Sequence, residues 1–154
     1  MSTQKPLKRH AALIPFSREH HHSLLLGWKI KTGFSKNVEI ERMKKYTDWF
    51  FKNHVLEHFE EEEKYIFPIL GNQHPLVKKA LADHERLTQL FNEEKDIEES
   101  LKGIQKELEA HIRFEERQLF KAIQEDASPE ELQKIEEIHA EIKFEDNTND
   151  QFWL

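Results

Sequence analysis

The chain has 154 residues, which is the length of one domain and enough to bury a single hydrophobic core. Charged residues make up 34% of it and hydrophobic residues 37%, with four Gly and five Pro, a composition that favours helices over strands and turns. The net charge of −7 argues against nucleic acid or an anionic membrane as a partner. Because cysteine is absent, disulfides and thiolate metal sites are excluded, and any metal would be held by nitrogen and oxygen atoms.

The N-terminal segment does not have the pattern of a secretion signal. Lys5, Lys8 and Arg9 precede an apolar stretch, Ala11 to Phe16, that Pro15 interrupts and that is too short for a signal-peptide core. No later stretch approaches the roughly 18 apolar residues of a membrane helix. We therefore expect a cytoplasmic protein without a membrane partner.

Two long amphipathic segments occupy the first half of the chain, and turn signals mark their ends. The first is predicted to open after Pro15, with Ser17 as its N-cap, and to stop at Gly33. The second is predicted to run from about Val38 to Leu70 and to end at Gly71. Both present apolar residues at helical spacing.

Two more long segments and one short segment follow. The third is predicted to begin near Leu76 and to continue through Phe91, and the fourth to run from about Ser100 to Glu125. After them, Ser128-Pro129-Glu130-Glu131 has the pattern of a capping box with Pro at the first helical position, which predicts a shorter fifth helix through Ile142. The apolar tail, Phe152 to Leu154, is expected to dock on the other helices.

These segments predict an all-α fold, an antiparallel up-down four-helix bundle with a short C-terminal fifth helix. Short connections join the second to the fourth segment, so neighbours in sequence are expected to lie antiparallel. We assign residues 1–15 to an N-terminal arm, residues 16–125 to the bundle, and residues 126–154 to a C-terminal helix and tail packed on the bundle.

The second and fourth segments contain the same motif, HxxxEExxxF, which starts at His58 and again at His111. Residues four apart share a helix face, so Glu62 lies beside the first His and Glu115 beside the second. Both pairs interrupt a stripe of apolar residues, where an ionised Glu costs several kcal/mol unless it is paired or bound to a metal. Two matched interruptions indicate a shared partner. The Phe that closes each motif is expected to lie in the core at one end of this site.

The first and third segments each add a His in a comparable setting. His84 lies on the apolar stripe of the third segment, with Asp83 next to it. In the first segment His20, preceded by Glu19, has the same local context and is preferred, but His21 could also face the core. With one such His on each of these helices beside the doubled motif, the pattern is more typical of a metal site than of isolated structural histidines.

This ordered set, a His, an HxxxE, a His and an HxxxE on four consecutive helices, resembles the hemerythrin-like HHE cation-binding family over about residues 16–123. The resemblance implies a hemerythrin-like bundle with two non-haem iron ions, bridged by an oxo or hydroxo group and by two glutamates. The implied ligands are His20, His58, Glu62, His84, His111 and Glu115. Zinc or manganese would also suit a mixed His and carboxylate set. The partner of such a site would be a small diatomic molecule or a peroxide.

The ligand count leaves room for further groups. Four imidazoles, two bridging carboxylates and an oxygen bridge fill about ten of the twelve positions of two octahedral irons. Water, Glu61, His21 or His54 could take the remaining positions. His54 ranks behind His58, because only His58 matches His111 in the repeated motif.

Two departures from the oxygen-carrying members of the family shift the expected function. Thr88 stands where those members have a second His on the third helix, and Glu116 stands where they close with Asp. The chain is therefore more similar to members that repair iron clusters, respond to stress or sense iron and oxygen. We expect iron, oxygen or nitric oxide sensing, a stress response or redox chemistry, with reversible oxygen binding as an alternative.

Other interpretations stay open. A ferritin-type site needs Glu-x-x-His on two helices, and Glu19–His22 and Glu136–His139 have that spacing, but without matched glutamate partners on the remaining helices. A metal-free or zinc-binding helical interaction module is a further alternative. No substrate pocket or cofactor loop is readable in the sequence, so an oxidase-like, peroxidase-like or iron-centre repair activity is left open.

Overall fold

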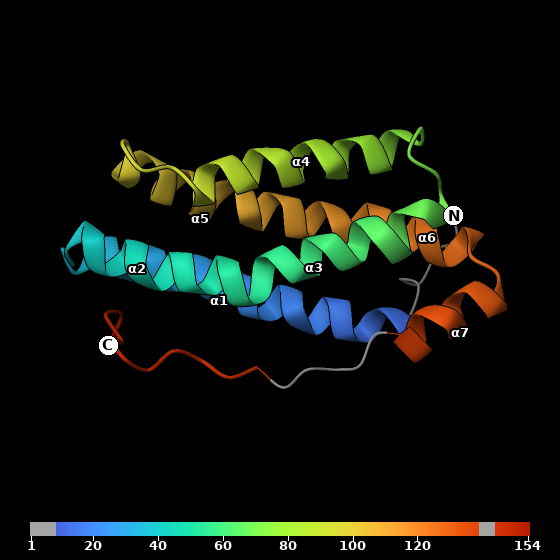
Figure 1. Cartoon of the computed structure of the whole chain (residues 1–154), viewed down its shortest axis with the longest axis horizontal. Helices are drawn as coiled ribbons and strands as arrows, with labels where there is room; N and C mark the ends of the chain where they lie inside the picture. The colour runs from blue at the N-terminus through green and yellow to red at the C-terminus, as the bar shows by residue number, and fades with distance from the viewer. Residues whose placement is uncertain (1–8, 139–143) are drawn as a thin grey trace, which may run out of the picture.

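The computed structural model describes residues 9–138 and 144–154, and every regular element within them is helical. The predicted all-α class is therefore confirmed for this part of the chain. Figure 1 shows the long helices lying lengthwise beside one another, and α5 packs against both α1 and α4. In the same residues no helix combines the length and the apolar character needed to cross a membrane.

Some helices are uninterrupted, whereas two long helical stretches contain short changes of pitch. The uninterrupted helices are α1 (Ile14–Ser35), α4 (Pro75–Phe91) and α7 (Pro129–Ile138), and a 3-10 turn, η1 (Ala11–Leu13), precedes α1. One interrupted stretch consists of α2 (Ile40–Phe50), the π-helical turn η2 (Phe51–Val55), α3 (Leu56–Glu61), the π-helical turn η3 (Glu62–Ile66) and the 3-10 turn η4 (Phe67–Ile69). The other consists of α5 (Ile97–Phe114), the π-helical turn η5 (Glu115–Leu119) and α6 (Phe120–Asp126).

The start of α1 differs from the prediction. The helix begins at Ile14, so Pro15 lies within its first turn, where the missing N–H leaves no helical hydrogen bond unmade. Ser17 is therefore inside the helix and is not its N-cap. Its hydroxyl instead donates a hydrogen bond to the Glu116 carboxylate, 3.1 Å away.

The end of α1 also differs, because the helix continues past Gly33 to Ser35. The chain then turns at Asn37, which has a φ of 57°. Gly33 serves packing rather than termination, since a Cβ at this position would collide with the side chains of Met43 and Phe152. The absence of a side chain here lets α2 and the C-terminal tail approach α1 closely.

The other helix starts lie nearer to the predicted positions. α4 begins at Pro75, and the side chain of His74 caps it by accepting a hydrogen bond from the Leu76 N–H, 3.1 Å away. α5 begins at Ile97, slightly before the predicted start at Ser100. These shifts leave the predicted order and number of long segments unchanged in the described residues.

The predicted capping box at the start of α7 is confirmed. The Ser128 N–H donates to the Glu131 carboxylate at 2.9 Å, and the Glu131 N–H donates to the Ser128 hydroxyl at 3.1 Å. Pro129 is the first residue of the helix, which is described as far as Ile138. The predicted continuation through Ile142 lies outside the described residues.

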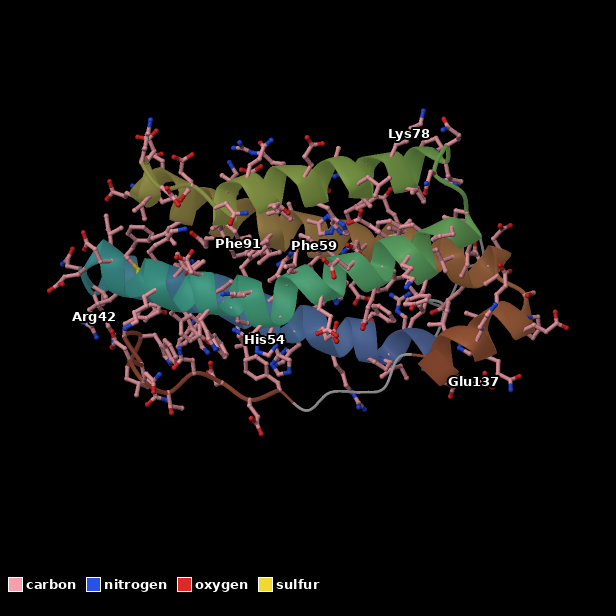
Figure 2. The ribbon with its side chains drawn as sticks, viewed as in Figure 1. Arg42, His54, Phe59, Lys78, Phe91 and Glu137 are labelled. Atoms are coloured by element: carbon pink, nitrogen blue, oxygen red, sulfur yellow. The ribbon has the colours of Figure 1, made fainter. Side chains whose placement is uncertain are left out.

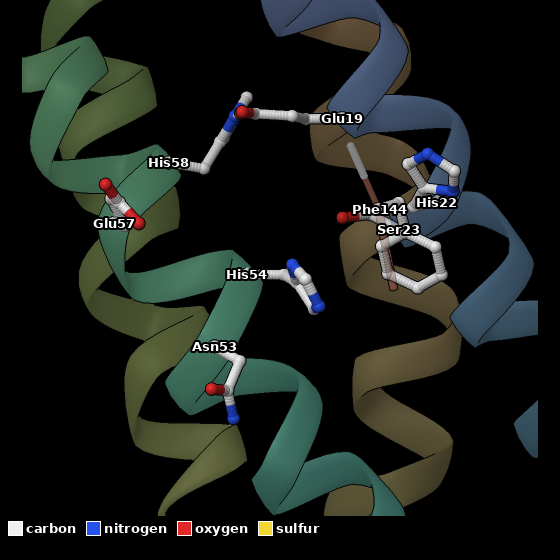
Figure 3. A pocket seen from close by; sticks show the side chains of 8 residues that line it. All are labelled: Glu19, His22, Ser23, Asn53, His54, Glu57, His58 and Phe144. Atoms are coloured by element: carbon white, nitrogen blue, oxygen red, sulfur yellow. The ribbon is translucent and has the colours of Figure 1, made fainter. Parts of the chain in front are cut away.

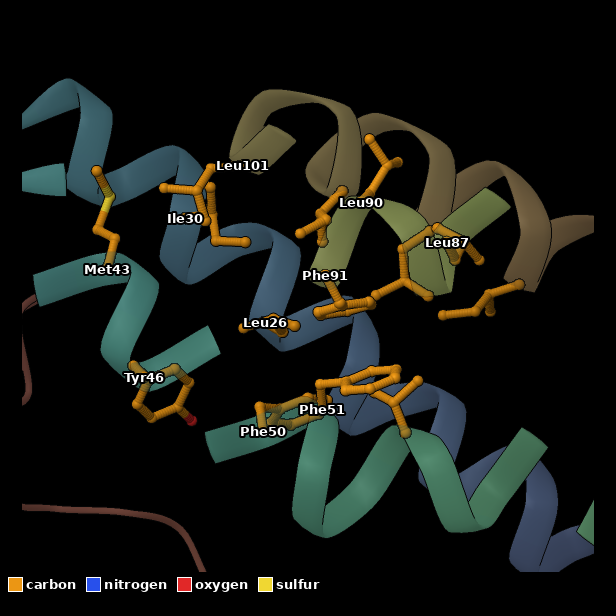
Figure 4. Packing of buried hydrophobic residues seen from close by; sticks show 14 of the residues in the cluster. Leu26, Ile30, Met43, Tyr46, Phe50, Phe51, Leu87, Leu90, Phe91 and Leu101 are labelled. Carbon is orange, nitrogen blue, oxygen red and sulfur yellow. The ribbon is translucent and has the colours of Figure 1, made fainter. Parts of the chain in front are cut away.

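The apolar core consists of two clusters at different heights along the helices. Leu26 and Phe91 belong to the first cluster, which Figure 4 shows, and Phe16 and Phe67 belong to the second. In Figure 2, Phe91 lies between the helices and the exposed Lys78 lies on the outside. This division of buried apolar and exposed charged side chains is the pattern expected of amphipathic helices.

Buried histidines lie where the helices pass from one cluster to the other. On α1, Phe16 belongs to the second cluster and Leu26 to the first, and His20 lies between them. The same order surrounds His84 on α4. The two clusters therefore leave a polar layer between them that is itself shielded from solvent.

The C-terminal tail docks on the first cluster through Phe152 and Trp153, as predicted. Leu154 does not dock, since it is 76% exposed. The buried Lys29 ammonium anchors the tail, because it donates a hydrogen bond to the Asp146 carboxylate at 2.7 Å and lies 4.0 Å from the centre of the Trp153 ring. The tail is thus fastened to α1 by an ion pair and by apolar packing.

Candidate metal centre

Six buried side chains from the long helical stretches meet in the polar layer between the two apolar clusters. They form two overlapping groups that share Glu62, and each group could hold a metal ion. None of the six is more than 7% exposed, and Glu62 and Glu115 are completely buried. The six are His20 on α1, His58 on α3, Glu62 in η3, His84 on α4, His111 on α5 and Glu115 in η5. The structure therefore brings together all the residues that the sequence singled out as ligands.

The Glu62 carboxylate faces histidines on both sides of the layer. One of its oxygens, Oε2, lies 3.3 Å from His58 Nε2 and 3.8 Å from His20 Nε2. Its other oxygen, Oε1, lies 3.3 Å from His84 Nε2. Two ligand atoms bound to one ion at ~2.1 Å are separated by about 3 to 4 Å, so these spacings suit atoms that share a metal.

The Glu115 carboxylate has the matching arrangement. Its Oε1 contacts His111 Nε2 and lies 3.5 Å from His84 Nε2, whereas its Oε2 lies 3.8 Å from His20 Nε2. Glu62 thus presents one oxygen to the histidines of α1 and α3 and the other to the histidine of α4. Glu115 presents one oxygen to the histidine of α1 and the other to the histidines of α4 and α5. A carboxylate that faces two groups of ligands in this way is able to bridge two ions.

The inward-facing atoms of the cluster lack hydrogen-bond partners. Among the described residues, Nε2 of all four histidines and both oxygens of Glu62 and of Glu115 are buried without one. Buried polar atoms are nearly always satisfied, and leaving one unsatisfied costs about 1–3 kcal/mol. These atoms face only one another, and a bound cation would satisfy all of their lone pairs at once, so the cluster could hold a metal ion.

The outward-facing nitrogens of the same histidines are all satisfied by carboxylates. His20 Nδ1 is hydrogen-bonded to Glu116 at 2.9 Å, and His84 Nδ1 to Glu63 at 2.9 Å. Metal-binding histidines commonly use their second nitrogen in this way, because a carboxylate fixes the tautomer and makes the metal-facing nitrogen more basic.

The other two histidines complete the pattern. His111 Nδ1 is hydrogen-bonded to Asp83 at 2.9 Å, and His58 Nδ1 is hydrogen-bonded to Glu19. With Nδ1 occupied, each ring directs Nε2 into the cluster. The tautomer and the orientation of the rings are therefore set before any metal binds.

The four carboxylates form a closed ring of contacts around the helices, which we call the carboxylate ring (Glu19, Glu63, Asp83 and Glu116). Each member is adjacent in sequence to one inner ligand but binds a histidine on a different helix. The contacts run from α1 to α3, from η3 to α4, from α4 to α5 and from η5 back to α1. Each helical stretch takes part in two of these hydrogen bonds, so rotating any one stretch would break both of them.

The role of this ring was not predicted from the sequence. Asp83 precedes His84 and Glu19 precedes His20 in the chain, but each carboxylate binds a histidine on another helix. The available signal was an acidic residue next to five of the six inner ligands, His111 being the exception, and it included the second Glu of each HxxxEE motif. Which histidine such a residue reaches depends on how the helices are rotated against one another.

The two inner glutamates begin π-helical turns, which the sequence analysis did not predict. In η3 the Phe67 N–H donates to the Glu62 carbonyl, and in η5 the Phe120 N–H donates to the Glu115 carbonyl. The longer turn lets two consecutive apolar residues enter the core after each Glu, and such turns often occur at functional sites. Both Phe residues are fully buried, as predicted.

These Phe rings also cover the centre on one side. The Phe120 ring stacks on His20 with 5.4 Å between ring centres, and the Phe67 ring lies 5.4 Å from His84. On the other side Phe59 stacks on His84 at 3.8 Å. Apolar walls of this kind exclude water and strengthen the interaction of the ligands with a cation.

The alternative ligands lie outside the cluster. His21 is exposed, so His20 is the residue that α1 contributes. Glu61 is partly exposed, and His54 faces a separate cavity. None of the three belongs to either group of ligand atoms in the described residues.

The ferritin-type arrangement is not assembled. Glu19 is hydrogen-bonded to His58 rather than placed as an inner ligand, and His22 packs against Phe144. Glu136 is exposed, and its partner His139 lies outside the described residues. The Glu-x-x-His spacings in the sequence therefore do not converge on one site in the part of the chain that is described.

Comparisons of the chain with protein-family models, curated proteins and solved structures returned no match. The functional interpretation therefore depends on the residues themselves and on their geometry.

The buried carboxylates favour the protonated forms of His58, His84 and His111 when no metal is bound. Burial lowers the pKa of His111, but Glu115 and Asp83 outweigh it and raise this pKa to about 9. Burial opposes the same shift for His58 and His84, yet neighbouring carboxylates raise the pKa of both well above the usual value. A metal ion binding here must displace these protons.

We expect the metal-free protein to lose stability as the pH rises from 6.5 to about 9. The pKa of His111 is higher in the folded than in the unfolded chain, so its contribution is complete below the unfolded value and disappears as the pH passes the folded value. Urea unfolding with a chelator present should show a loss on the order of 2 kcal/mol. The metal-loaded protein should show no such loss, because proton release favours metal binding at higher pH. Equal stability of the metal-free protein at both pH values would contradict this assignment.

Asp83→Asn should weaken metal binding by about 10- to 100-fold, because an amide stabilises the Nδ1–H of His111 less well than a carboxylate does. A competition titration against a chelator measures the change. Asp48→Asn is the matched control, since Asp48 is exposed on α2 and pairs with Lys44 at 2.7 Å. An affinity equal to that of the control would show that the carboxylate ring does not support the centre.

Proposed function

We propose that the chain is a non-haem di-iron protein of the hemerythrin-like HHE class, with functions in iron, oxygen or nitric oxide sensing, stress response or redox chemistry. The observation that carries this proposal is the position of the two buried carboxylates. Glu62 and Glu115 each face both groups of histidines, which is the arrangement needed to bridge a pair of ions.

The arrangement of the helices supports the antiparallel up-down bundle that this class implies. In Figure 1, α1 and α4 run from right to left, whereas the α2–α3 and α5–α6 stretches run from left to right. α5 packs against α1 and α4, and ligands from the four stretches meet in one layer. A bundle of this kind brings inward-facing side chains from all of its helices to one depth.

The donor set is compatible with iron, and the charge of the site favours two ions over one. Imidazole and carboxylate ligands suit iron, manganese and zinc, and thiolates, which would favour zinc or copper, are absent from the chain. With neutral imidazoles, the two inner carboxylates and the four of the carboxylate ring carry a formal charge of −6, of which Arg9 beside Glu116 and Lys79 beside Asp83 offset two. A pair of multivalent cations would compensate most of this charge, whereas a single divalent ion would not.

Two histidines and two carboxylate oxygens for each ion leave positions for small molecules. Bound iron would supply redox chemistry and an open site for oxygen, peroxide or nitric oxide. The chain's own residues orient the imidazoles through the carboxylate ring and exclude water with the Phe rings. A centre with open positions on shielded ions suits sensing or redox reactions.

Thr88 supports this choice over reversible oxygen carriage. Its hydroxyl donates a hydrogen bond to the backbone carbonyl of His84, 2.7 Å away, so it does not replace a ligand at the centre. The third helix thus contributes one histidine only to the ligand groups in the described residues. Fewer ligands leave more positions open, which favours reaction over storage of an intact oxygen molecule.

Anaerobic addition of ferrous iron to the metal-free protein should give about two irons per chain. Glu62→Ala and Glu115→Ala should each lower the iron content and the metal-dependent part of the thermal stability, because each removes a bridge. Glu60→Ala is the control, since Glu60 is exposed on the same helix. Unchanged iron content in both bridge variants, or a native preparation that holds zinc and no iron, would contradict the proposal.

The reduced iron protein, exposed separately to oxygen, peroxide and nitric oxide, should be oxidised by the first two and should bind the third. Absorption in the near ultraviolet reports oxidation to the bridged ferric form. A stable oxygen adduct that is released again under vacuum would instead establish oxygen carriage.

A further inference from the structure

A surface groove of about 310 Å³ lies between α1 and α5. Among the described residues, these two helices supply all of its lining. The cavity on the side of α1 that faces η2 and α3 differs, because there the ring of Phe144 from the C-terminal segment stacks on His22, with 4.0 Å between ring centres (Figure 3). We call the surface groove the α1–α5 groove and define it by Leu24, Gly27, Trp28, Lys31, Leu108 and Arg113.

Exposed apolar side chains cluster on the α1 side of the groove. Trp28 is 54% exposed, and Leu24 and Leu25, one turn before it, are 39% and 38% exposed. A single exposed apolar residue is common on protein surfaces, whereas several large ones side by side mark an interaction site. Trp is also among the residues that contribute most to the binding energy of protein interfaces. This part of α1 therefore has the character of a contact surface.

The groove is concave. Leu108 lines it but is only 2% exposed, so this side chain lies at its base. Gly27 also lines it and, without a side chain, leaves the space between the helices open. A recess with an apolar base receives the side chains of a helix, whereas a membrane surface is flat and contacts protruding residues. The shape of the groove therefore favours a protein helix as its occupant.

Positive charge borders the groove on both helices. Lys31 lines it on α1, and α1 contains no acidic residue after Glu19. On α5, η5 and α6, every exposed charged residue from position 102 to position 121 is a Lys or an Arg. These residues are Lys102, Lys106, Arg113, Arg117 and Lys121. This local excess of positive charge contrasts with the net charge of −7 for the whole chain.

The acidic residues in the same stretch of α5 and η5 are already engaged. Glu109 pairs with Arg113 at 2.5 Å, and Glu107 pairs with Arg86 of α4 at 3.1 Å. The other two belong to the candidate centre and to the carboxylate ring. The face that contains the groove therefore attracts an acidic partner and repels a basic one.

We propose that the α1–α5 groove is a docking site for an acidic amphipathic helix of a partner protein. The apolar side of that helix enters the groove against Leu24 and Trp28, and its carboxylates face Lys31 and the cations of α5. Helices that dock in this way use apolar anchors at i, i+3, i+4 and i+7. A second copy of the chain is a poorer occupant, because across a two-fold axis the positive charges of the groove would meet their own equivalents. The docking site is independent of the metal that the centre holds.

Selection from a displayed library of random helical peptides, with the wild-type protein as the target, identifies the occupant without assuming its sequence. We expect the most enriched peptides to carry Glu or Asp on one helix face and large apolar residues on the other. Enrichment of basic peptides, or of no peptide, would overturn the proposal.

Fluorescence polarisation with the most enriched peptide locates its binding site. Trp28→Ala and Lys31→Glu should each weaken binding by about tenfold or more, and added salt should weaken binding to the wild-type protein. Leu56→Ala and Lys52→Glu are the matched controls, since both residues are exposed outside the groove. Wild-type affinity in Trp28→Ala and Lys31→Glu would overturn the proposal. Circular dichroism checks that each variant folds, and Lys31→Glu keeps the test valid if Trp28→Ala does not.

Three further measurements test other occupants of the groove. Sedimentation velocity reports self-association, cosedimentation with vesicles of phosphatidylcholine and phosphatidylserine reports membrane binding, and a gel shift with duplex DNA reports nucleic-acid binding. We expect none of these interactions in the wild-type protein. Any one of them, if Trp28→Ala abolished it, would assign the groove to that occupant and overturn the acidic helix.

Discussion

The structure depends on one repeated interaction, a hydrogen bond that the outer nitrogen of a buried histidine donates to a carboxylate on a neighbouring helix. Each of these bonds satisfies one ring nitrogen and directs the other into a shielded layer. Because the four bonds close into a ring, they couple the rotation of every long helical stretch to its neighbours. The geometry of the centre and the packing of the helices are therefore specified by the same contacts.

The two halves of the chain contribute equivalent parts to this ring. Glu19 and His20 on α1 correspond to Asp83 and His84 on α4, and the π-helical turns η3 and η5 correspond to one another. Equivalent halves produce two similar groups of ligands on either side of a pair of carboxylates. The proposal of a pair of ions depends more on this near symmetry than on the number of ligands.

Burial of the centre has opposite effects on binding and on access. The apolar clusters above and below the polar layer strengthen the interaction between ligands and a cation, since little water remains to screen it. The same clusters close the direct path from solvent.

The sequence by itself determined the all-helical class and five of the six inner side chains. A His and a Glu four residues apart share a helix face wherever the helix is placed, and His84 lies on the apolar stripe of its own helix. It also determined the capping box of α7, which is a local pattern. Only the tertiary structure decided which carboxylate supports which histidine, as Asp83 illustrates by reaching His111 rather than its neighbour His84. It likewise decided between His20 and His21. These choices depend on the rotation and spacing of helices that are distant in sequence, and no local periodicity encodes them.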